Sequence, residues 1–248
     1  VGNIRYLAYG GYDYVWSVGF NTAAAVAETA PKFPDTTFCT IDVRLDDTPP
    51  NVITTEFAEQ EGAFLAGWIA AALTRSEAIG FLGGVRSPLI RRFERGFVAG
   101  ARHRNAKVAV ETAYTDSFVS YAAGRREADA LYNEGCDIVF HAAGSAGRGA
   151  IRSAVEHERF IIGVDTDQSF LAPTAVVTSM LKRVDTVVEE LTTALLRGEA
   201  IGERVRTFGI ADGAILLAPV THPEWTSALQ RELDAVTVGV RDGSIDVG

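Results

Sequence analysis

The sequence has few of the residues that would place it in a metal-binding, disulfide-bonded or membrane-spanning class. Its two cysteines, Cys39 and Cys136, fall in or beside separate expected strands, which favours buried free thiols. The four histidines are scattered, so no set of metal ligands is evident, and we expect neither a metal nor a cofactor. The longest apolar stretch, Ala63–Leu73, is too short for a bilayer, which needs roughly 20 residues.

Basic residues are also scarce. Lys and Arg number 23 against 32 Asp and Glu, the net charge is −9, and basic residues cluster only in pairs. This composition argues against a nucleic-acid partner, because neutralised phosphates supply most of such affinity. Residues 1–20 lack a basic segment followed by an apolar core, which fits a cytosolic protein or a mature or trimmed secreted one.

Apolar, β-branched runs alternate with helical segments along the 248 residues. This alternation predicts βαβ units and parallel sheets, thus an α/β fold. About ten strands exceed what one doubly wound sheet of this length usually holds, which favours two α/β lobes. We place lobe one at 1–77 and 174–205 and lobe two at 78–173 and 206–248, with crossings near Ser76–Ala78 and Phe170–Pro173.

The stretch Phe160–Arg183 is the strongest site candidate. Its apolar run Phe160–Val164 reads as a buried strand and ends on Asp165, Asp167 and Gln168. In open α/β sheets, ligands bind outside the carboxyl ends of the strands. A second extended run leads into Lys182, where a cation at a helix start opposes the dipole and favours a functional role over a surface one.

Three aromatic residues lie within or shortly after expected strands. Phe118 follows a strand in a polar loop. The pattern supports two interpretations equally, a buried cap and a stacking surface for a flat ligand. The same two readings apply to Phe20, whereas the mid-strand position of Phe140 favours core packing. The strand-end acids Asp42 and Asp165 have an alternative role as caps of the following helix.

Two further patterns have plain interpretations. The turn Gly144-x-x-Gly147-x-Gly149 resembles a dinucleotide fingerprint with altered spacing. Without residues suited to hydride chemistry, we favour glycines that let a ligand or helix approach the strand end. For Arg91 and Arg92 we expect that at least one lies on a solvated helix face.

Several runs together resemble the basic membrane protein (BMP) family, namely GVDTDQSFLAP, TSMLKRVD, FAEQEGAFLAG, GFLGG, IRRFERGFVAGA, YTDSF and VFHAAGSAGRG. That family comprises substrate-binding proteins of ABC transporters, including purine nucleoside receptor lipoproteins. The resemblance implies a type I periplasmic-binding fold with two doubly wound lobes, three crossovers and a nucleoside, usually a purine, in the cleft between closing lobes. It also implies a monomer without enzymatic activity, an ABC permease as partner, and an extracytoplasmic location with a lipid anchor in the precursor.

The resemblance also assigns roles by position. Asp42 and Asp165 match acids that accept hydrogen bonds from ribose hydroxyls. Phe118 matches an aromatic residue that stacks on the base, and Lys182 matches a cation that binds a sugar hydroxyl or a base acceptor. The remaining positions expected to line the cleft are Phe20, Asn21 and Gly144.

The chain departs from the family at its start. Family members carry a βαβ unit before the strand at Asp13–Gly19, but only twelve residues precede it here, and such a unit needs roughly 30. We therefore expect an incomplete lobe one with fewer strands than lobe two and an open edge at Tyr14–Val18. The rival hypotheses are an NAD-dependent or nucleoside-cleaving enzyme using Asp165, and a cytosolic sensor or transcription activator on the same fold.

Overall fold

The chain folds into two compact α/β units, in a computed structural model that describes residues 2–45, 47–199 and 204–248. Unit 1 comprises Val1–Ala58 and Val184–Phe208, and unit 2 comprises Glu59–Arg183 and Gly209–Gly248. The chain therefore passes between the units three times, after Ala58, Arg183 and Phe208. The expected two-lobe α/β fold is confirmed.

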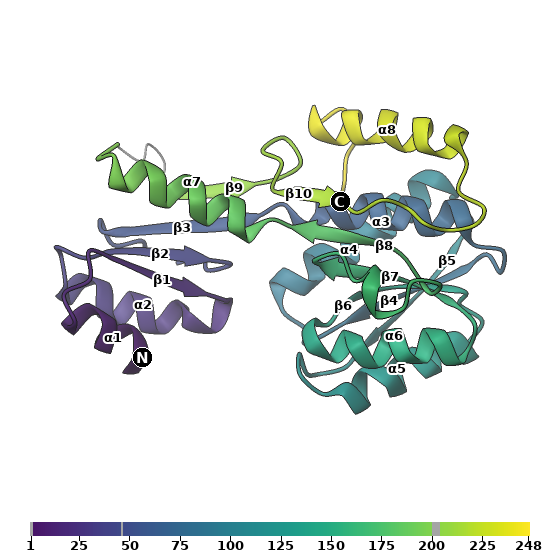
Figure 1. Ribbon diagram of the computed structural model, residues 1–248, viewed down its shortest axis with the longest axis horizontal. Coiled ribbons are helices and arrows are strands. Elements are labelled where there is room, and N and C mark those ends of the chain that lie inside the picture. The colour runs from purple at the N-terminus through teal and green to yellow at the C-terminus, as the bar shows by residue number, and fades with distance from the viewer. Residues whose placement is uncertain (1, 46, 200–203) are drawn as a thin grey trace. The chain divides into compact units, whose positions relative to one another are not determined.

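Unit 1 contains a four-stranded sheet of order β1-β2-β3-β9 in which every pairing is parallel. Figure 1 shows α1 and α2 on one face of this sheet and α7 on the other. The first face is closed by a core that includes Val15, Val26, Phe38 and Val52. The elements are α1 (Gly2–Tyr9), β1 (Tyr14–Val18), α2 (Ala23–Thr29), β2 (Thr37–Ile41), β3 (Val52–Phe57), α7 (Val184–Leu196) and β9 (Val205–Phe208).

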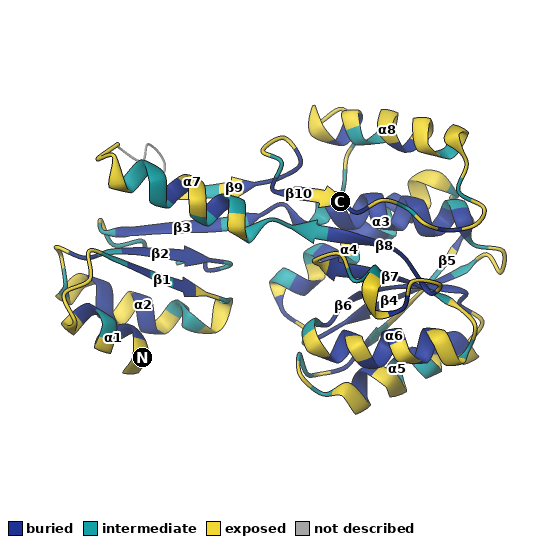
Figure 2. Ribbon diagram, in the orientation of Figure 1, coloured by how far each residue is buried: buried dark blue, intermediate teal, exposed yellow. Residues whose placement is uncertain are grey.

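Unit 2 contains a six-stranded sheet of order β10-β8-β7-β6-β4-β5, parallel except for β10. Helices α5 and α6 cover one face, and α3 and α8 lie on the other (Figure 1). The central strands β4, β6, β7 and β8 are mostly buried, whereas the edge strand β5 is largely exposed (Figure 2). The elements are α3 (Glu59–Leu73), β4 (Ala78–Gly83), α4 (Pro88–Arg104), β5 (Ala109–Tyr114), α5 (Tyr121–Asn133), β6 (Ile138–Ala142), α6 (Gly147–Glu156), β7 (Phe160–Asp165), β8 (Val176–Lys182), β10 (Ile215–Leu217) and α8 (Ser227–Arg241).

The strand order of unit 2 contains a topological switch point. From β4 the chain first adds β5 on one side, and then β6, β7 and β8 on the other. In a doubly wound sheet this reversal opens a crevice at the carboxyl ends of the two strands where it occurs. For unit 2 these are the ends of β4 and β6.

The boundaries of the units differ from those expected. Helix α3 belongs to unit 2, because it packs on α4 so closely that a Cβ on Gly67 would lie 2.0 Å from the Phe97 carbonyl oxygen. A Cβ on Gly100 would lie 1.8 Å from the Phe64 oxygen, so hydrogen alone fits at both positions. Strand β8 also belongs to unit 2, where it pairs with β7, whereas β9 pairs with β3 in unit 1. The expected crossings near residues 77 and 173 are therefore replaced by those after Ala58 and Arg183.

Most expected elements are present, and α3 and α4 have the expected bounds. Helix α1 was not expected; it buries Ile4 and Ala8. Helix α8 begins later than expected, because the Thr226 side chain caps it by accepting a hydrogen bond from the Leu229 backbone N–H at 3.2 Å. The lower strand number of unit 1 and the edge position of β1 are confirmed for the described residues.

Cys39 and Cys136 are buried free thiols, as expected. Burial raises the pKa of each to about 12, so both are neutral and unreactive at ordinary pH. Among the described residues, no helix combines the length and the apolar character needed to cross a membrane.

Candidate ligand-binding site

Phe118 occupies the switch point of unit 2. A Cβ on Gly84, just after β4, would lie 2.3 Å from the Phe118 ring, and a Cβ on Gly144, just after β6, would lie 3.1 Å from the Phe118 carbonyl oxygen. Gly144 has a φ of 55°, a conformation that glycine adopts without strain. The Phe118 side chain is half-buried. Phe140, by contrast, is fully buried and packs on Phe97, as expected of a core residue.

The two strand-end acids singled out in the sequence share an unusual backbone. Asp165 ends β7 with a φ of 68°, and Asp42 follows β2 with a φ of 58°. The left-handed region costs most side chains roughly 1–2 kcal/mol, although Asp and Asn tolerate it best. Such residues cluster at functional sites. Asp165 is exposed and Asp42 is half-buried.

The loop after Asp165 is held by its own polar side chains. Asp167 Oδ1 accepts a hydrogen bond from the Ser169 N–H at 2.9 Å. Gln168 Oε1 accepts one from the Val164 N–H at 3.3 Å and lies 2.8 Å from His141 Nε2. Of the three polar side chains expected at this strand end, Asp167 and Gln168 therefore stabilise the loop, and Asp165 is a ligand candidate through its position at the end of β7.

His141 supports that loop from inside unit 2. Because Gln168 Oε1 already accepts from the Val164 N–H, His141 Nε2 must carry its proton and donate it to the same oxygen. Burial lowers the pKa of His141 to about 4, while the hydrogen bond to Gln168 opposes that shift. His141 Nδ1 is buried and has no hydrogen-bond partner among the described residues. This role could not be predicted from the sequence, because a histidine inside an apolar strand is typical of a core residue.

The glycine-rich turn after β6 accommodates this histidine and the packing of helices. A Cβ on Gly147 would lie 2.1 Å from the His141 ring, and one on Gly149 would lie 2.1 Å from the Tyr121 carbonyl oxygen. The interpretation that these glycines permit close approach of a helix to the strand end is confirmed.

Lys182 is the last residue of β8 and lies in a buried ion-pair network rather than on the surface. Its side chain is 6% exposed, and its ammonium lies 3.0 Å from Glu59 Oε1. The fully buried Glu59 also accepts a hydrogen bond from Arg92 Nε, through Oε2 at 3.0 Å. Arg91, the neighbour of Arg92, is exposed, in line with the expectation for this pair. Glu59 was not anticipated as a site residue.

Unit 1 brings its three candidates to one edge of its sheet. Phe20 and Asn21 follow β1, and Asp42 follows β2, its parallel neighbour. Gly19, with a φ of 94°, turns the chain so that Phe20 opens a 3₁₀ turn. Phe20 is 44% exposed and Asn21 is exposed.

In unit 2 the four candidates follow or end four parallel strands. Phe118 follows β5, Gly144 follows β6, Asp165 ends β7 and Lys182 ends β8. Because the carboxyl ends of parallel strands share one edge of a sheet, all four belong to the edge where this fold binds ligands. An aromatic ring, a carboxylate and an ammonium at that edge suit a flat, polar organic molecule.

Residues 1–241 match the sequence model of the PnrA-like ABC transporter substrate-binding proteins, Bmp. The chain belongs to this family. One relative is basic membrane protein A of Borreliella burgdorferi, 36% identical over 230 residues that cover 90% of this chain and 67% of that protein. The chain spans about two thirds of the length of such relatives, and 62% in the case of basic membrane protein A1 of Borrelia garinii.

Solved structures place the Bmp fold among solute-binding proteins and regulators. The chain resembles an ABC transporter solute-binding protein from Aeropyrum pernix K1, with a TM-score of 0.88, 24% identity, and coverage of 99% of this chain and 80% of that one. It also resembles a transcriptional activator of the comK gene from Bacillus halodurans, with a TM-score of 0.85, 18% identity, and coverage of 98% and 83%. Because one fold serves both functions, function has to be argued from the site.

Proposed function

We propose that this Bmp protein binds a nucleoside, with purine nucleosides as the preferred class, and presents it unaltered to an ABC permease outside the cytoplasmic membrane. Family membership supports the transport role. The observation that carries the ligand class is the strand-end edge of unit 2, where Asp165 and the half-buried Phe118 occur together.

Each candidate suits one part of a nucleoside. A carboxylate offers two acceptor oxygens and no donor, which suits the vicinal diol of ribose, and we assign this role to Asp165 and Asp42. An aromatic ring stacks on a base, and we assign this role to Phe118, with Phe20 as a second aromatic candidate. The remaining proposed contacts come from Asn21, Gly144 and the ammonium of Lys182.

The proposal is tested by thermal unfolding of the purified protein with a panel of nucleosides. A purine nucleoside at 100 times its dissociation constant stabilises the folded state by about 2.7 kcal/mol. For a protein of this size, that corresponds to a rise in melting temperature of roughly 5–10 °C. Guanosine, inosine or adenosine should produce this rise in melting temperature, and the matching 2′,3′-dideoxynucleosides should produce a much smaller rise.

Mass spectrometry of the same samples checks that the protein performs no reaction. The nucleoside recovered after denaturation should be intact. Separate base and sugar would instead support a nucleoside-cleaving enzyme. Melting curves that no nucleoside moves, or a different class of molecule released from the purified protein, would overturn the ligand assignment.

A further inference from the structure

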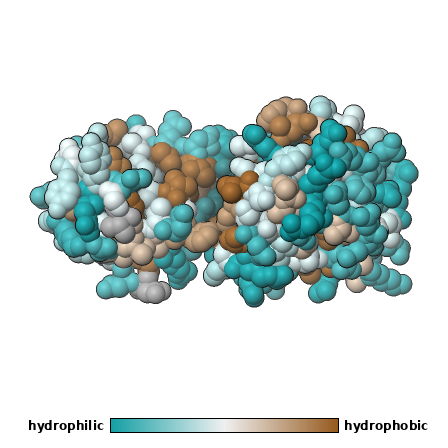
Figure 3. All heavy atoms as spheres, turned by 90° about the horizontal axis from the view of Figure 1, so that it is seen from below, coloured by the Kyte–Doolittle hydropathy of each residue, from teal (hydrophilic) through white to brown (hydrophobic). Residues whose placement is uncertain are grey.

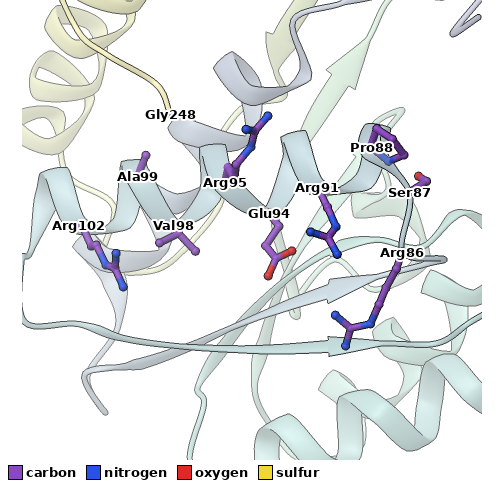
Figure 4. A pocket seen from close by; sticks show the side chains of 10 residues that line it. All are labelled: Arg86, Ser87, Pro88, Arg91, Glu94, Arg95, Val98, Ala99, Arg102 and Gly248. Carbon is purple, nitrogen blue, oxygen red and sulfur yellow. The ribbon is translucent and has the colours of Figure 1, made fainter.

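A groove of about 830 Å³ runs along α4 of unit 2, and none of the proposed nucleoside contacts lines it. Four of its lining residues are arginines and one is an acid. Figure 4 shows Arg86, Arg91 and Glu94 extending to one side of α4, and Arg95 to the other, beside Gly248. The complete lining is Arg86, Ser87, Pro88, Arg91, Glu94, Arg95, Val98, Ala99, Arg102 and Gly248.

The arginines of this groove have no acidic partner among the residues that the structure describes. All four are exposed, and none forms an ion pair within the described part of the chain. Two other arginines of α4 do have such partners, since Arg92 pairs with Glu59 and Arg104 with Glu232. Among the described residues, α4 and the turn before it therefore carry two sets of arginines, and those of the groove form no ion pair with an acidic side chain.

The single acid of the groove is already engaged. Glu94 Oε2 accepts a hydrogen bond from the Tyr114 hydroxyl group. The Arg86 guanidinium lies over the ring of the same tyrosine, 4.1 Å from its centre. Tyr114 thus anchors both Glu94 and Arg86 at one end of the groove. The net charge of the chain is −9, so this concentration of unpaired positive charge is local.

The spacing of the arginines defines the shape of a complementary partner. Arg91 and Arg102 extend to the same side of α4 (Figure 4), and they lie eleven residues apart, about 16 Å along the helix axis. One phosphate cannot reach charges so far apart. An extended peptide covers 16 Å with about five residues, and its alternate side chains lie about 6.6 Å apart.

We propose that this arginine groove is a docking site for a short acidic segment of a partner protein, bound in an extended conformation. Guanidinium groups bind carboxylates through paired, charge-assisted hydrogen bonds. Pro88, Val98 and Ala99 supply apolar contacts between the charges. A long polyanion would continue onto the surface of an acidic protein and be repelled. A flat lipid surface does not enter a concave groove.

The test uses a fluorescent peptide in which glutamate and serine alternate over about six residues, and its anisotropy is measured against the purified protein. The wild type should bind it, and raised salt should weaken the binding. The double variant Arg91→Gln/Arg102→Gln should bind at least about tenfold more weakly, since each change removes charge-assisted hydrogen bonds. The matched control Arg126→Gln/Arg152→Gln removes two exposed arginines of α5 and α6 and should bind as the wild type does.

Four outcomes would overturn the proposal. The first is that the wild type does not bind the peptide, and the second is that both double variants lose affinity equally. The third is that the wild type binds equally well a peptide with glutamine in place of glutamate. The fourth is that the wild type binds phosphatidylglycerol vesicles but not the peptide. Unchanged melting temperatures of both double variants would show that the folded state is retained, because all four substituted side chains are exposed.

Discussion

The ammonium of Lys182 lies 3.0 Å from Glu59 Oε1, in a pair whose side chains are 6% and 0% exposed. Glu59 thereby fixes the direction of a cation that we assign to the ligand. It also accepts a hydrogen bond from Arg92, so its carboxylate balances two positive charges. Removing one partner of a buried ion pair leaves an uncompensated charge.

Glu59→Gln should therefore lower the free energy of unfolding by about 3–5 kcal/mol. Urea denaturation of the ligand-free protein measures this loss. The matched control is Glu232→Gln, which removes an exposed partner of Arg104 and should cost no more than about 1 kcal/mol. Equal, small losses in both variants would show that Glu59 does not stabilise unit 2.

Phe118→Ala should weaken nucleoside binding by roughly 1–3 kcal/mol, the range for base stacking on aromatic side chains. Because Phe118 is half-buried, its loss should destabilise unit 2 by less than the about 3–5 kcal/mol typical of a buried phenylalanine. Calorimetry measures the loss of nucleoside affinity, and the midpoint of denaturant unfolding measures the loss of stability. Phe170→Ala, which alters an aromatic side chain that is 73% exposed, is the control for both. A large loss of stability with unchanged affinity would assign Phe118 to the core.

The sequence was sufficient to locate the strand ends, and hence Asp165 and Lys182, because an apolar run indicates a strand whatever its neighbours in the sheet are. It was not sufficient to find Glu59, whose partners Arg92 and Lys182 lie 33 and 123 residues away. From the sequence, Glu59 was indistinguishable from an acid that complements a helix dipole. The expected unit boundaries were wrong for the same reason, since the sequence predicts an extended run at Ala175–Met180 but not that this strand pairs with β7.

Asp165→Asn should abolish the preference for ribose over 2′,3′-dideoxyribose. Asparagine tolerates the left-handed backbone, so the substitution removes charge and one acceptor without the strain that alanine would add. The expected loss of affinity for the ribonucleoside is about 1.5–3 kcal/mol. Asp116→Asn, at an exposed residue with a φ of 51° after β5, is the matched control. Calorimetry that finds the same discrimination in Asp165→Asn and the wild type would exclude Asp165 as a ribose ligand.

The buried His141 should make stability depend on pH. Its pKa falls from 6.5 to about 4 on folding, so the unfolded chain binds more protons between these values. Its contribution to stability is therefore complete above pH 6.5 and is lost as the pH falls toward 4. Between pH 7 and pH 5 this group should lower the free energy of unfolding by about 2 kcal/mol.

His141→Asn keeps a hydrogen-bond donor for Gln168 but does not titrate in this range. The difference in unfolding free energy between this variant and the wild type should therefore narrow by the same amount as the pH falls from 7 to 5. The midpoints of urea denaturation at pH 7 and at pH 5 measure this narrowing. His103→Asn, which replaces an exposed histidine, is the control variant. A constant difference between His141→Asn and the wild type would show that folding does not lower the pKa of His141.

Strand β1 forms an edge of the sheet of unit 1. It pairs with β2, and no further strand pairs with it within the described residues. Hydrophobic and aromatic side chains are exposed beside this edge, since Tyr12 is 57%, Val18 61% and Phe20 44% exposed. Hydrophobic residues reach the surface of this unit on the face shown in Figure 3. An apolar edge strand is a template for pairing with another chain, which a lysine at the edge opposes.

A protein of residues 1–248 should therefore self-associate as its concentration rises, and Val18→Lys should suppress that association. The charge adds repulsion between copies and a desolvation cost wherever two edges meet. Sedimentation velocity over a range of concentrations measures the effect. Val238→Lys makes the same change at a side chain that is 52% exposed on α8, away from any strand, and should leave self-association at the level of the wild type. Equal suppression by both lysines would attribute the effect to net charge, and a wild type that stays monomeric would show that the β1 edge does not recruit a second chain.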